Sequence, residues 1–316
     1  MKRVAFIVFF LLFACFFVFS TGDKEIKYPE SVKLMVLKGP GALGLLPLID
    51  KKKLADVPLD IIYEDSPVAG YERLSQDAVD IAVMPVNLAA KLYNENDGYK
   101  MFSVYIWGIL YLVGPEPLTQ ANFAGKRIFL PSKGANPDIM FLRLIDSWGL
   151  LDKVEINYAE SPLALAEAVE RKDADYALLP EPFVSRVLSS RSDLVVAMDI
   201  QDMWHREYGV PFPQTCLLVK NEFLYTFPGF FELISSSLAE SVLELLSTRD
   251  FYVYEETLAV IGLSPKLASF ALPRCRFSYV DSVSVRSSVE AYLSVLLDYN
   301  PELVGGKLPD DGFYIR

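Results

Sequence analysis

Two glycine-containing loops are where the sequence predicts ligand-binding chemistry. Each follows a strand-like run and precedes a helix-like pattern: 38–41 reads Lys-Gly-Pro-Gly, and 132–136 reads Ser-Lys-Gly-Ala-Asn. A helix that begins after such a loop leaves backbone N–H groups unpaired, and these groups favour an acceptor or an anionic group on a ligand. The alternative is that each loop is a tight turn that needs glycine for its conformation.

Polar and aromatic side chains near these loops extend the candidate site. Asn87 follows Pro85 and either caps its helix or faces a ligand. Glu181 has the equivalent place in the second half, where a carboxylate either stabilises a helix dipole or accepts hydrogen bonds from a ligand's amino group. Trp107 offers a stacking surface or ordinary packing. The candidate ligand-binding residues are Lys38, Gly39, Pro40, Gly41, Ser66, Asn87, Trp107, Lys133, Gly134, Asn136, Glu160, Glu181 and Phe183.

Catalytic chemistry has no visible centre in the sequence. The one histidine, His205, has no cysteine or carboxylate at metal-ligand spacing and no nucleophile partner. The nucleotide-binding, hydrolase and metalloprotease patterns do not occur. We therefore expect a protein that is not an enzyme and that uses no cofactor and no metal ion.

The elements that position these loops repeat along the chain. Lys133 follows Lys38, and Pro180 follows Pro85, at the same offset of 95 positions. Strand-like and helix-like runs alternate between these landmarks, which predicts βαβ units with mostly parallel sheets covered by helices. Ligands of such sheets lie beyond the carboxyl ends of the strands. The repeat therefore predicts an α/β protein with two lobes whose rims face each other, and the β-rich runs 104–113 and 215–219 are its hinge candidates.

The N-terminus predicts export. Lys2 and Arg3 precede sixteen unbroken apolar residues, 4–19, and a polar stretch follows. This arrangement is typical of a secretory signal, and the apolar run is short for a bilayer span. We expect a signal peptide over residues 1–20 with cleavage after Ser20. The alternatives are a lipoprotein signal that ends before Cys15, which would carry lipid, and an uncleaved anchor.

The net charge bears on the kinds of binding partner, and the cysteine content bears on a possible disulfide. The formal net charge is −11 at pH 7, and no basic stripe offsets it, so we expect no nucleic-acid partner. An exported compartment permits a disulfide between Cys216 and Cys275. Two buried, unpaired thiols are the alternative.

Five segments together resemble one bacterial group. They are 38–40, 80–90, 179–184, 273–275 and 304–314, and the resemblance covers roughly residues 31 to 314. The group comprises the solute-binding proteins of nitrate/sulfonate/taurine-type ABC importers and includes binders of thiamine-pyrimidine precursors. One departure is that 41–44 reads Gly-Ala-Leu-Gly, where relatives often have a second Gly or Thr-Gly after Lys-Gly-Pro.

The resemblance implies a type II periplasmic-binding-protein fold, with two α/β lobes and two crossover strands. We expect lobe one in residues 31–113 plus 215–316 and lobe two in 114–214. It implies a periplasmic or extracytoplasmic monomer that closes on a small organic solute, such as a sulfonate, taurine or a pyrimidine precursor. An ABC permease and its ATPase would be the partners, and the membrane would be contacted only through them or a lipid anchor. The alternatives are an exported sensor or surface protein not coupled to transport, and an enzyme of pyrimidine-precursor metabolism.

Overall fold

A computed structural model describes residues 26–76 and 78–315. The predictions of a signal peptide over residues 1–20 and of lipidation at Cys15 lie outside these ranges. Among the helices within them, none combines the length and the apolar character that crossing a bilayer requires.

Strands and helices alternate along most of the chain. The strands are β1 (Val32–Leu37), β2 (Lys53–Leu54), β3 (Val57–Glu64), β4 (Ile81–Pro85), β5 (Tyr99–Ile106), β6 (Leu110–Gly114), β7 (Arg127–Pro131), β8 (Glu155–Ala159), β9 (Tyr176–Pro180), β10 (Val195–Asp199), β11 (Thr215–Lys220) and β12 (Phe277–Asp281). The helices are α1 (Pro40–Leu43), α2 (Leu46–Lys51), α3 (Pro67–Ser75), α4 (Val86–Glu95), α5 (Asn136–Ser147), α6 (Pro162–Glu170), α7 (Phe183–Ser190), α8 (Ile200–Tyr208), α9 (Asn221–Thr226), α10 (Pro228–Ser247), α11 (Glu255–Val260), α12 (Pro265–Ala271) and α13 (Ser282–Tyr299).

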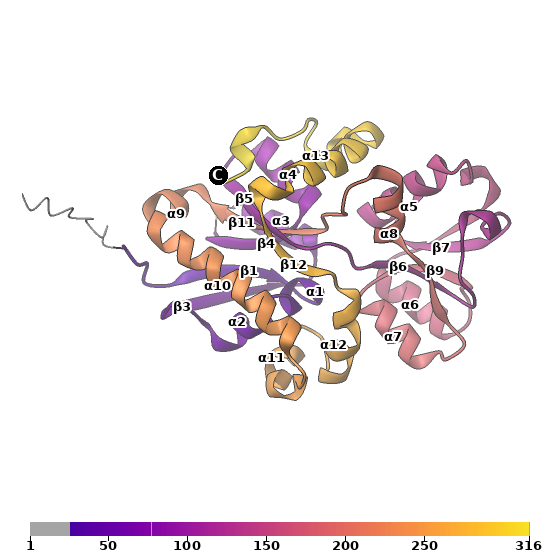
Figure 1. Ribbon diagram of the computed structural model, residues 1–316, viewed down its shortest axis with the longest axis horizontal. Helices are drawn as coiled ribbons and strands as arrows, with labels where there is room; N and C mark the ends of the chain where they lie inside the picture. The colour runs from indigo at the N-terminus through magenta and orange to yellow at the C-terminus, as the bar shows by residue number, and fades with distance from the viewer. Residues whose placement is uncertain (1–25, 77, 316) are drawn as a thin grey trace, which may run out of the picture.

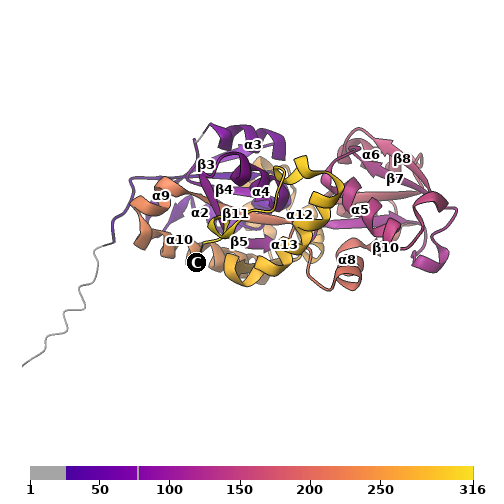
Figure 2. The same cartoon turned by 90° about the horizontal axis from the view of Figure 1, so that it is seen from above.

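The strands form two sheets. The larger has seven strands in the order β12-β5-β11-β4-β1-β3-β2, and the smaller has five in the order β10-β6-β9-β7-β8. Helices flank both sheets, with α10 and α13 beside the larger sheet and α5 to α7 around the smaller one (Figures 1 and 2). The predicted α/β class with two helix-flanked sheets is therefore confirmed. We call the part built on the larger sheet the large-sheet unit and the part built on the smaller sheet the small-sheet unit.

Both sheets are mixed, although the sequence predicts mostly parallel ones. The parallel pairs are β1 with β3 and β4, and β7 with β8 and β9. Antiparallel pairing occurs at the strands on either side of the passages between the sheets, namely β5, β6, β10 and β11, and it also joins β12 to β5 and β2 to β3. Parallel strands need a covering helix between them, whereas these four are joined across the two sheets.

The chain passes between the sheets twice. The outward passage is short and comprises residues 107–109, because β5 ends at Ile106 and β6 begins at Leu110 in the smaller sheet. This change of sheet comes before the boundary expected after residue 113. The return runs through α8 and residues 209–214 to β11, which lies inside the larger sheet between β5 and β4. The extent of the two lobes as separate units stays a prediction.

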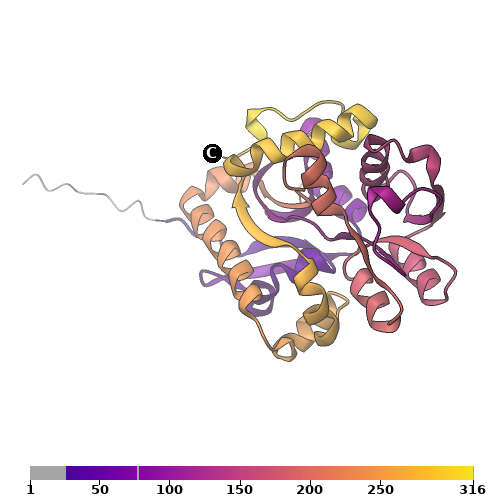
Figure 3. The same ribbon diagram turned by 45° about the vertical axis from the view of Figure 1, so that its right-hand side comes forward.

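Apolar residues fill both faces of each sheet. The apolar stripe of α10 is buried, as is the stripe of α13 that includes Tyr292. One core cluster combines α13 of the large-sheet unit with Trp204 of α8 and with Ile139 and Met140 of α5. The view in Figure 3 shows the C-terminal helix reaching toward the small-sheet unit. The two units therefore share one apolar contact surface.

Candidate functional site

The predicted site residues lie at the carboxyl ends of parallel strands. In the large-sheet unit, Lys38 and Gly39 follow β1, Ser66 follows β3 and Asn87 lies just after β4. In the small-sheet unit, 132–136 follow β7, Glu160 follows β8 and Glu181 follows β9. Ligands of α/β sheets bind at this edge. The sequence pattern therefore places the candidates on one rim of each unit.

The two rims approach each other near Gly39. This residue has φ +80°, and a Cβ built on it would lie 3.9 Å from Cδ of Pro182, which follows β9. Two helix pairs join the units as well, α12 with α7 and α5 with α13. The loop of the first glycine thus faces the small-sheet unit at close range.

The N–H groups of the two loop glycines, Gly39 and Gly134, are paired within the protein. The Gly39 N–H donates to the carbonyl oxygen of Ile261 over 3.1 Å. The Gly134 N–H donates to Oδ2 of Asp138 over 2.7 Å. Pro40 begins α1, and the carbonyl oxygen of the buried Gly41 accepts a hydrogen bond from Tyr105. These contacts fix the turns at the two glycines, and the role of the loops in ligand binding stays a prediction.

Several predicted polar residues also have partners within the protein. The Lys38 ammonium lies 2.7 Å from Asp65. Ser66 Oγ accepts from the Ala69 N–H and caps α3. Lys133 is exposed and lies 5.3 Å above the ring of Tyr158. Glu160 is exposed, and its carbonyl oxygen accepts from Ser132.

Glu181 is buried, with 2% of its surface exposed. Its carboxylate accepts hydrogen bonds from both the N–H and the hydroxyl of Ser185, at 3.1 and 2.9 Å. Arg274, from the large-sheet unit, lies 3.7 Å away. Burial raises the pKa of Glu181 to about 7, and Ser185 and Arg274 oppose that shift. The expected ligand carboxylate is thus a structural group between α7 and the chain before β12.

The two predicted aromatic contacts are packed. Trp107 is half-buried and donates its ring N–H to the carbonyl oxygen of Ser278 over 2.8 Å. Phe183 begins α7 and packs against a core cluster of the small-sheet unit. Neither side chain is free to rotate without losing these contacts.

Asn87 and Asn136 differ from the other candidates. Each stands in the first turn of a helix that follows a parallel strand, Asn87 in α4 and Asn136 in α5. The Oδ1 atoms of both are buried and, among the described residues, have no hydrogen-bond partner. A buried polar atom in this state costs about 1–3 kcal/mol. Among the predicted residues, these two have buried side-chain oxygens that are free to accept a hydrogen bond.

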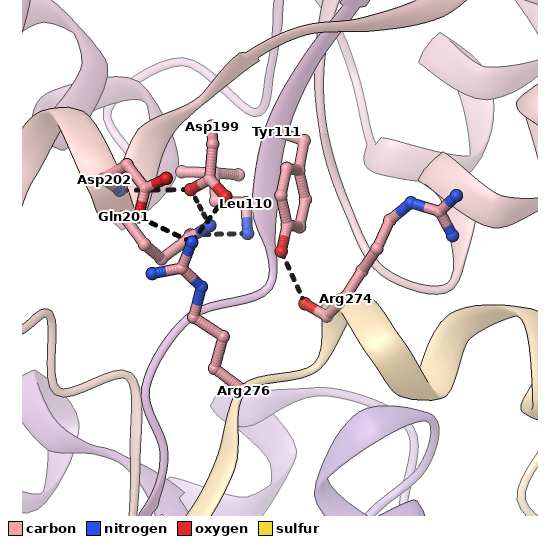
Figure 4. Close-up of polar contacts among 7 residues, drawn as sticks. All are labelled: Leu110, Tyr111, Asp199, Gln201, Asp202, Arg274 and Arg276. Carbon is pink, nitrogen blue, oxygen red and sulfur yellow. Dashed lines mark hydrogen bonds and ion pairs between the residues drawn. The ribbon is translucent and has the colours of Figure 1, made fainter.

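A polar network that the sequence does not predict holds the outward passage. Gln201 Oε1 accepts from the Leu110 N–H over 2.8 Å, and its amide donates to Asp199 over 3.0 Å. Gly108, at φ +144°, allows this approach, since a Cβ there would lie 1.7 Å from Gln201 Cγ. Figure 4 shows Gln201 reaching toward Leu110 beside the passage.

Arg276 extends this network from the large-sheet unit. Its guanidinium contacts Asp199 over 2.6 Å and Asp202 over 2.8 Å, where β10 leads into α8. Nearby, the Tyr111 hydroxyl donates to the carbonyl oxygen of Arg274 over 2.8 Å (Figure 4). Partners 70 or more positions apart make these contacts, and no local motif marks them. The network ties both units to the two passages.

Cys216 and Cys275 are free and buried, so the possible disulfide is not formed. Cys216 lies on β11 in the cluster that contains Tyr292, and Cys275 lies in the cluster of α10. The two side chains therefore belong to different core clusters. The two cysteines match the alternative expectation of two buried, unpaired thiols.

In the described part of the chain, neither the surface cavity nor the potential metal-binding side chains form a second candidate functional site. A surface cavity of about 490 Å³ is lined by Ser189 and by residues of 249–252 and 265–270, none of them a predicted site residue. Within residues 26–76 and 78–315, no group of three His, Cys, Asp or Glu side chains is placed to hold a metal ion.

Comparison with solved structures gives matches over nearly the whole chain. A structure of an ABC transporter from Parabacteroides distasonis matches with a TM-score of 0.73 and 26% identity, over 91% of this chain and 99% of that one. The periplasmic aliphatic sulphonate binding protein SsuA from Escherichia coli matches with a TM-score of 0.72 and 15% identity, over 92% and 93%. The alkanesulfonate-binding protein SsuA from Xanthomonas axonopodis pv. citri, bound to MOPS, matches with a TM-score of 0.58 and 18% identity, over 90% and 96%.

No protein-family model and no curated protein matches the chain. The matched structures are described as transport and binding proteins, in agreement with the expectation that the chain is not an enzyme. The resemblance read from the sequence is confirmed at the level of structure. The chain has the fold of the periplasmic binding proteins of ABC transporters.

Proposed function

We propose that this chain is the substrate-binding component of an ABC import system. It captures a small organic solute between the rims of its two units and delivers it to a permease coupled to an ATPase. The observation that carries the proposal is the pair Asn87 and Asn136, whose buried amide oxygens lack partners among the described residues and come from opposite units. A ligand between the units would satisfy both.

Closure follows from how the units are joined. A ligand that touches both rims gains its full set of contacts only when the units are together, so it shifts the open–closed equilibrium toward the closed form. The passages at 107–109 and 209–214 are short enough to act as hinges. The contacts of α5 with α13 and of α7 with α12 are those that such closure makes and breaks.

Location and ligand follow the same proposal. The chain acts as an exported monomer, in the periplasm or an equivalent compartment. The solute is a small organic molecule of the sulfonate, taurine or pyrimidine-precursor kind. The fold likeness supports this range, and the exposed rim charges Lys133 and Glu160 are compatible with a ligand of mixed polarity.

A thermal-shift screen of the chain from residue 21 onward tests the proposal. The panel contains taurine, MOPS, alkanesulfonates and pyrimidines. A ligand at one hundred times its Kd should stabilise the folded state by about 2.7 kcal/mol. Small-angle scattering should then show a smaller radius of gyration with ligand than without it.

A matched pair of variants makes the test specific. Asn136→Ala should weaken binding at least tenfold. Asn157→Ala removes an amide from the same unit that already pairs with Glu155, and it should leave binding unchanged. A folded protein whose melting temperature and radius of gyration respond to no compound would contradict the proposed function.

A further inference from the structure

The segment just before β12 directs its side chains to two sides. Cys275 has an extended backbone, with φ −89° and ψ 106°. Its side chain is buried in the core cluster of the large-sheet unit that includes α10. In an extended chain the neighbouring side chains project to the opposite side. Arg274 and Arg276 therefore point away from that core, and Figure 4 shows both side chains extending from this segment.

The backbone of the same segment pairs with the outward passage. The Trp107 N–H donates to the carbonyl oxygen of Arg276 over 2.9 Å, and the Arg276 N–H donates to the carbonyl oxygen of Gly108 over 3.1 Å. These two bonds continue the pairing of β12 with β5, in which Phe277 lies opposite Ile106. The segment therefore lies alongside the residues that connect the two sheets.

The outward passage enters the small sheet through the middle one of three adjacent strand ends. Strand β6 lies between β10 and β9 and is antiparallel to both. Asp199, at the end of β10, lies opposite Tyr111 of β6. Pro180, at the end of β9, lies opposite Leu110, the first residue of β6. Both neighbouring strands therefore end where β6 begins.

Residues of the segment contact all three of these strand ends. The Arg276 guanidinium lies 2.6 Å from the Asp199 carboxylate, at the end of β10. The carbonyl oxygen of Arg274 accepts from the Tyr111 hydroxyl of β6 over 2.8 Å. The Arg274 guanidinium lies 3.7 Å from the carboxylate of Glu181, the residue after β9. The large-sheet unit thus holds the small sheet at β6 and on both sides of it.

This arrangement bears on how the two units move. A passage made of one extended strand allows bending, which changes the separation of the rims, and rotation about the strand, which turns the rims out of line. The return passage, 209–214, contains neither a helix nor a strand. Contacts on both sides of β6 oppose rotation, because a turn in either direction lengthens the contact on one side.

We propose that residues 274–276 form a clamp that suppresses rotation of the small-sheet unit about β6 and leaves bending as its movement. Arg274 and Arg276 are the positioning residues of this clamp. Each partly exposed ion pair contributes little alone, so the clamp depends on the contacts acting together. The proposal rests on the function proposed above only in that bending is the movement that brings the rims onto a solute.

Electron–electron double resonance on the empty protein tests the clamp. Spin labels are attached at Glu72→Cys in α3 and at Asp152→Cys between α5 and β8, two exposed positions, under conditions in which the protein without these substitutions takes up no label. The double variant Arg274→Gln/Arg276→Gln should broaden the distribution of label distances roughly twofold. Each single variant should give an intermediate width, which keeps the test available if the double variant does not fold.

Two further variants separate positioning from general stability. Arg186 pairs with Glu170 over 2.9 and 2.7 Å inside the small-sheet unit, so Arg186→Gln should lower the urea midpoint and leave the distance distribution unchanged. Arg276→Lys keeps a cation for Asp199, so Arg274→Gln/Arg276→Lys should give a narrower distribution than the double glutamine variant.

Two outcomes would refute the clamp. One is an equal width in the wild type and in the arginine variants, and the other is the same broadening in Arg186→Gln. The measurement uses the empty protein, so its result is independent of the ligand screen. A screen without any response, together with a broadened distribution in the double variant, would contradict the proposed function and leave the clamp intact.

Discussion

Replacing Gly108 with alanine tests how the outward passage is held. This glycine lies between β5 and β6 at φ +144°, where residues with a side chain are rarely found. Its missing side chain leaves room for Gln201, which accepts from the Leu110 N–H and donates to Asp199. The substitution therefore acts on backbone strain and on a buried hydrogen-bond network together.

The expected loss in free energy of unfolding is the sum of the backbone strain and the lost hydrogen bond. Strain at an unfavourable φ costs about 1–3 kcal/mol. The new Cβ would lie 1.7 Å from Gln201 Cγ and 2.4 Å from its Cδ, so Gln201 must leave its place. The buried Leu110 N–H then loses its acceptor, at about 1–3 kcal/mol. We expect Gly108→Ala to lower the free energy of unfolding by roughly 3–5 kcal/mol in total.

Urea denaturation of the wild type and four variants separates the backbone strain from the loss of the hydrogen bond. Gly134→Ala supplies the strain alone, because that glycine has φ +79° and a Cβ there would meet no atom within 4 Å. Gln201→Ala removes the obstructed side chain, so Gly108→Ala should cost about 2 kcal/mol less in that background than in wild type. The reasoning is refuted if Gly108→Ala costs no more than Gly134→Ala, or if its cost is the same with and without Gln201.

Three further results follow from buried charges and thiols. Burial raises the pKa of Glu181 to about 7, so the folded protein holds a proton that the unfolded chain releases near 4.5. The free energy of unfolding should therefore fall by up to about 3 kcal/mol as pH rises through this window, and Glu181→Gln should abolish that slope in urea titrations at several pH values. Arg276→Ala removes two carboxylate contacts on a partly exposed side chain and should cost about 1–2 kcal/mol in the same assay; no loss would show that the passages are held without it. Burial raises the pKa of both Cys216 and Cys275, so neither thiol should react with a disulfide reagent until the protein is denatured, and fast native labelling of either would show that it is accessible.

The positions of the rims were predictable because they depend on local patterns. A buried run that ends at Pro85, followed by Asn87 and an apolar stripe, is a strand followed by a helix in any α/β protein. The pair Ser161-Pro162 likewise begins α6, and Ser161 Oγ accepts from the Ala164 N–H over 3.1 Å. Parallel sheets then bring such helix starts to one edge without further information.

The state of the groups at the rims was not predictable in the same way. The Gly39 N–H is paired with Ile261, 222 positions further along the chain, and only the tertiary fold brings them together. Asp138, by contrast, is four positions from Gly134, and an acidic residue in the first turn of a helix is a local signal for such a bond. Glu181 is a structural group because it is buried and lies 3.7 Å from Arg274, and residue spacing shows neither the burial nor that contact.

Helical periodicity gave the correct face of α13 and still left its chemistry open. It places Tyr292 in the core, and the ring is indeed 0% exposed. Periodicity orders whole side chains by hydropathy, so it treats a tyrosine as apolar and says nothing about its hydroxyl. Whether that hydroxyl is satisfied depends on Asn136, which belongs to the other unit. Whether a polar group at the junction of two units has a partner is decided by residues that only the complete fold brings together. Such groups are found from polar atoms without partners in the complete fold, and not from the pattern of either half.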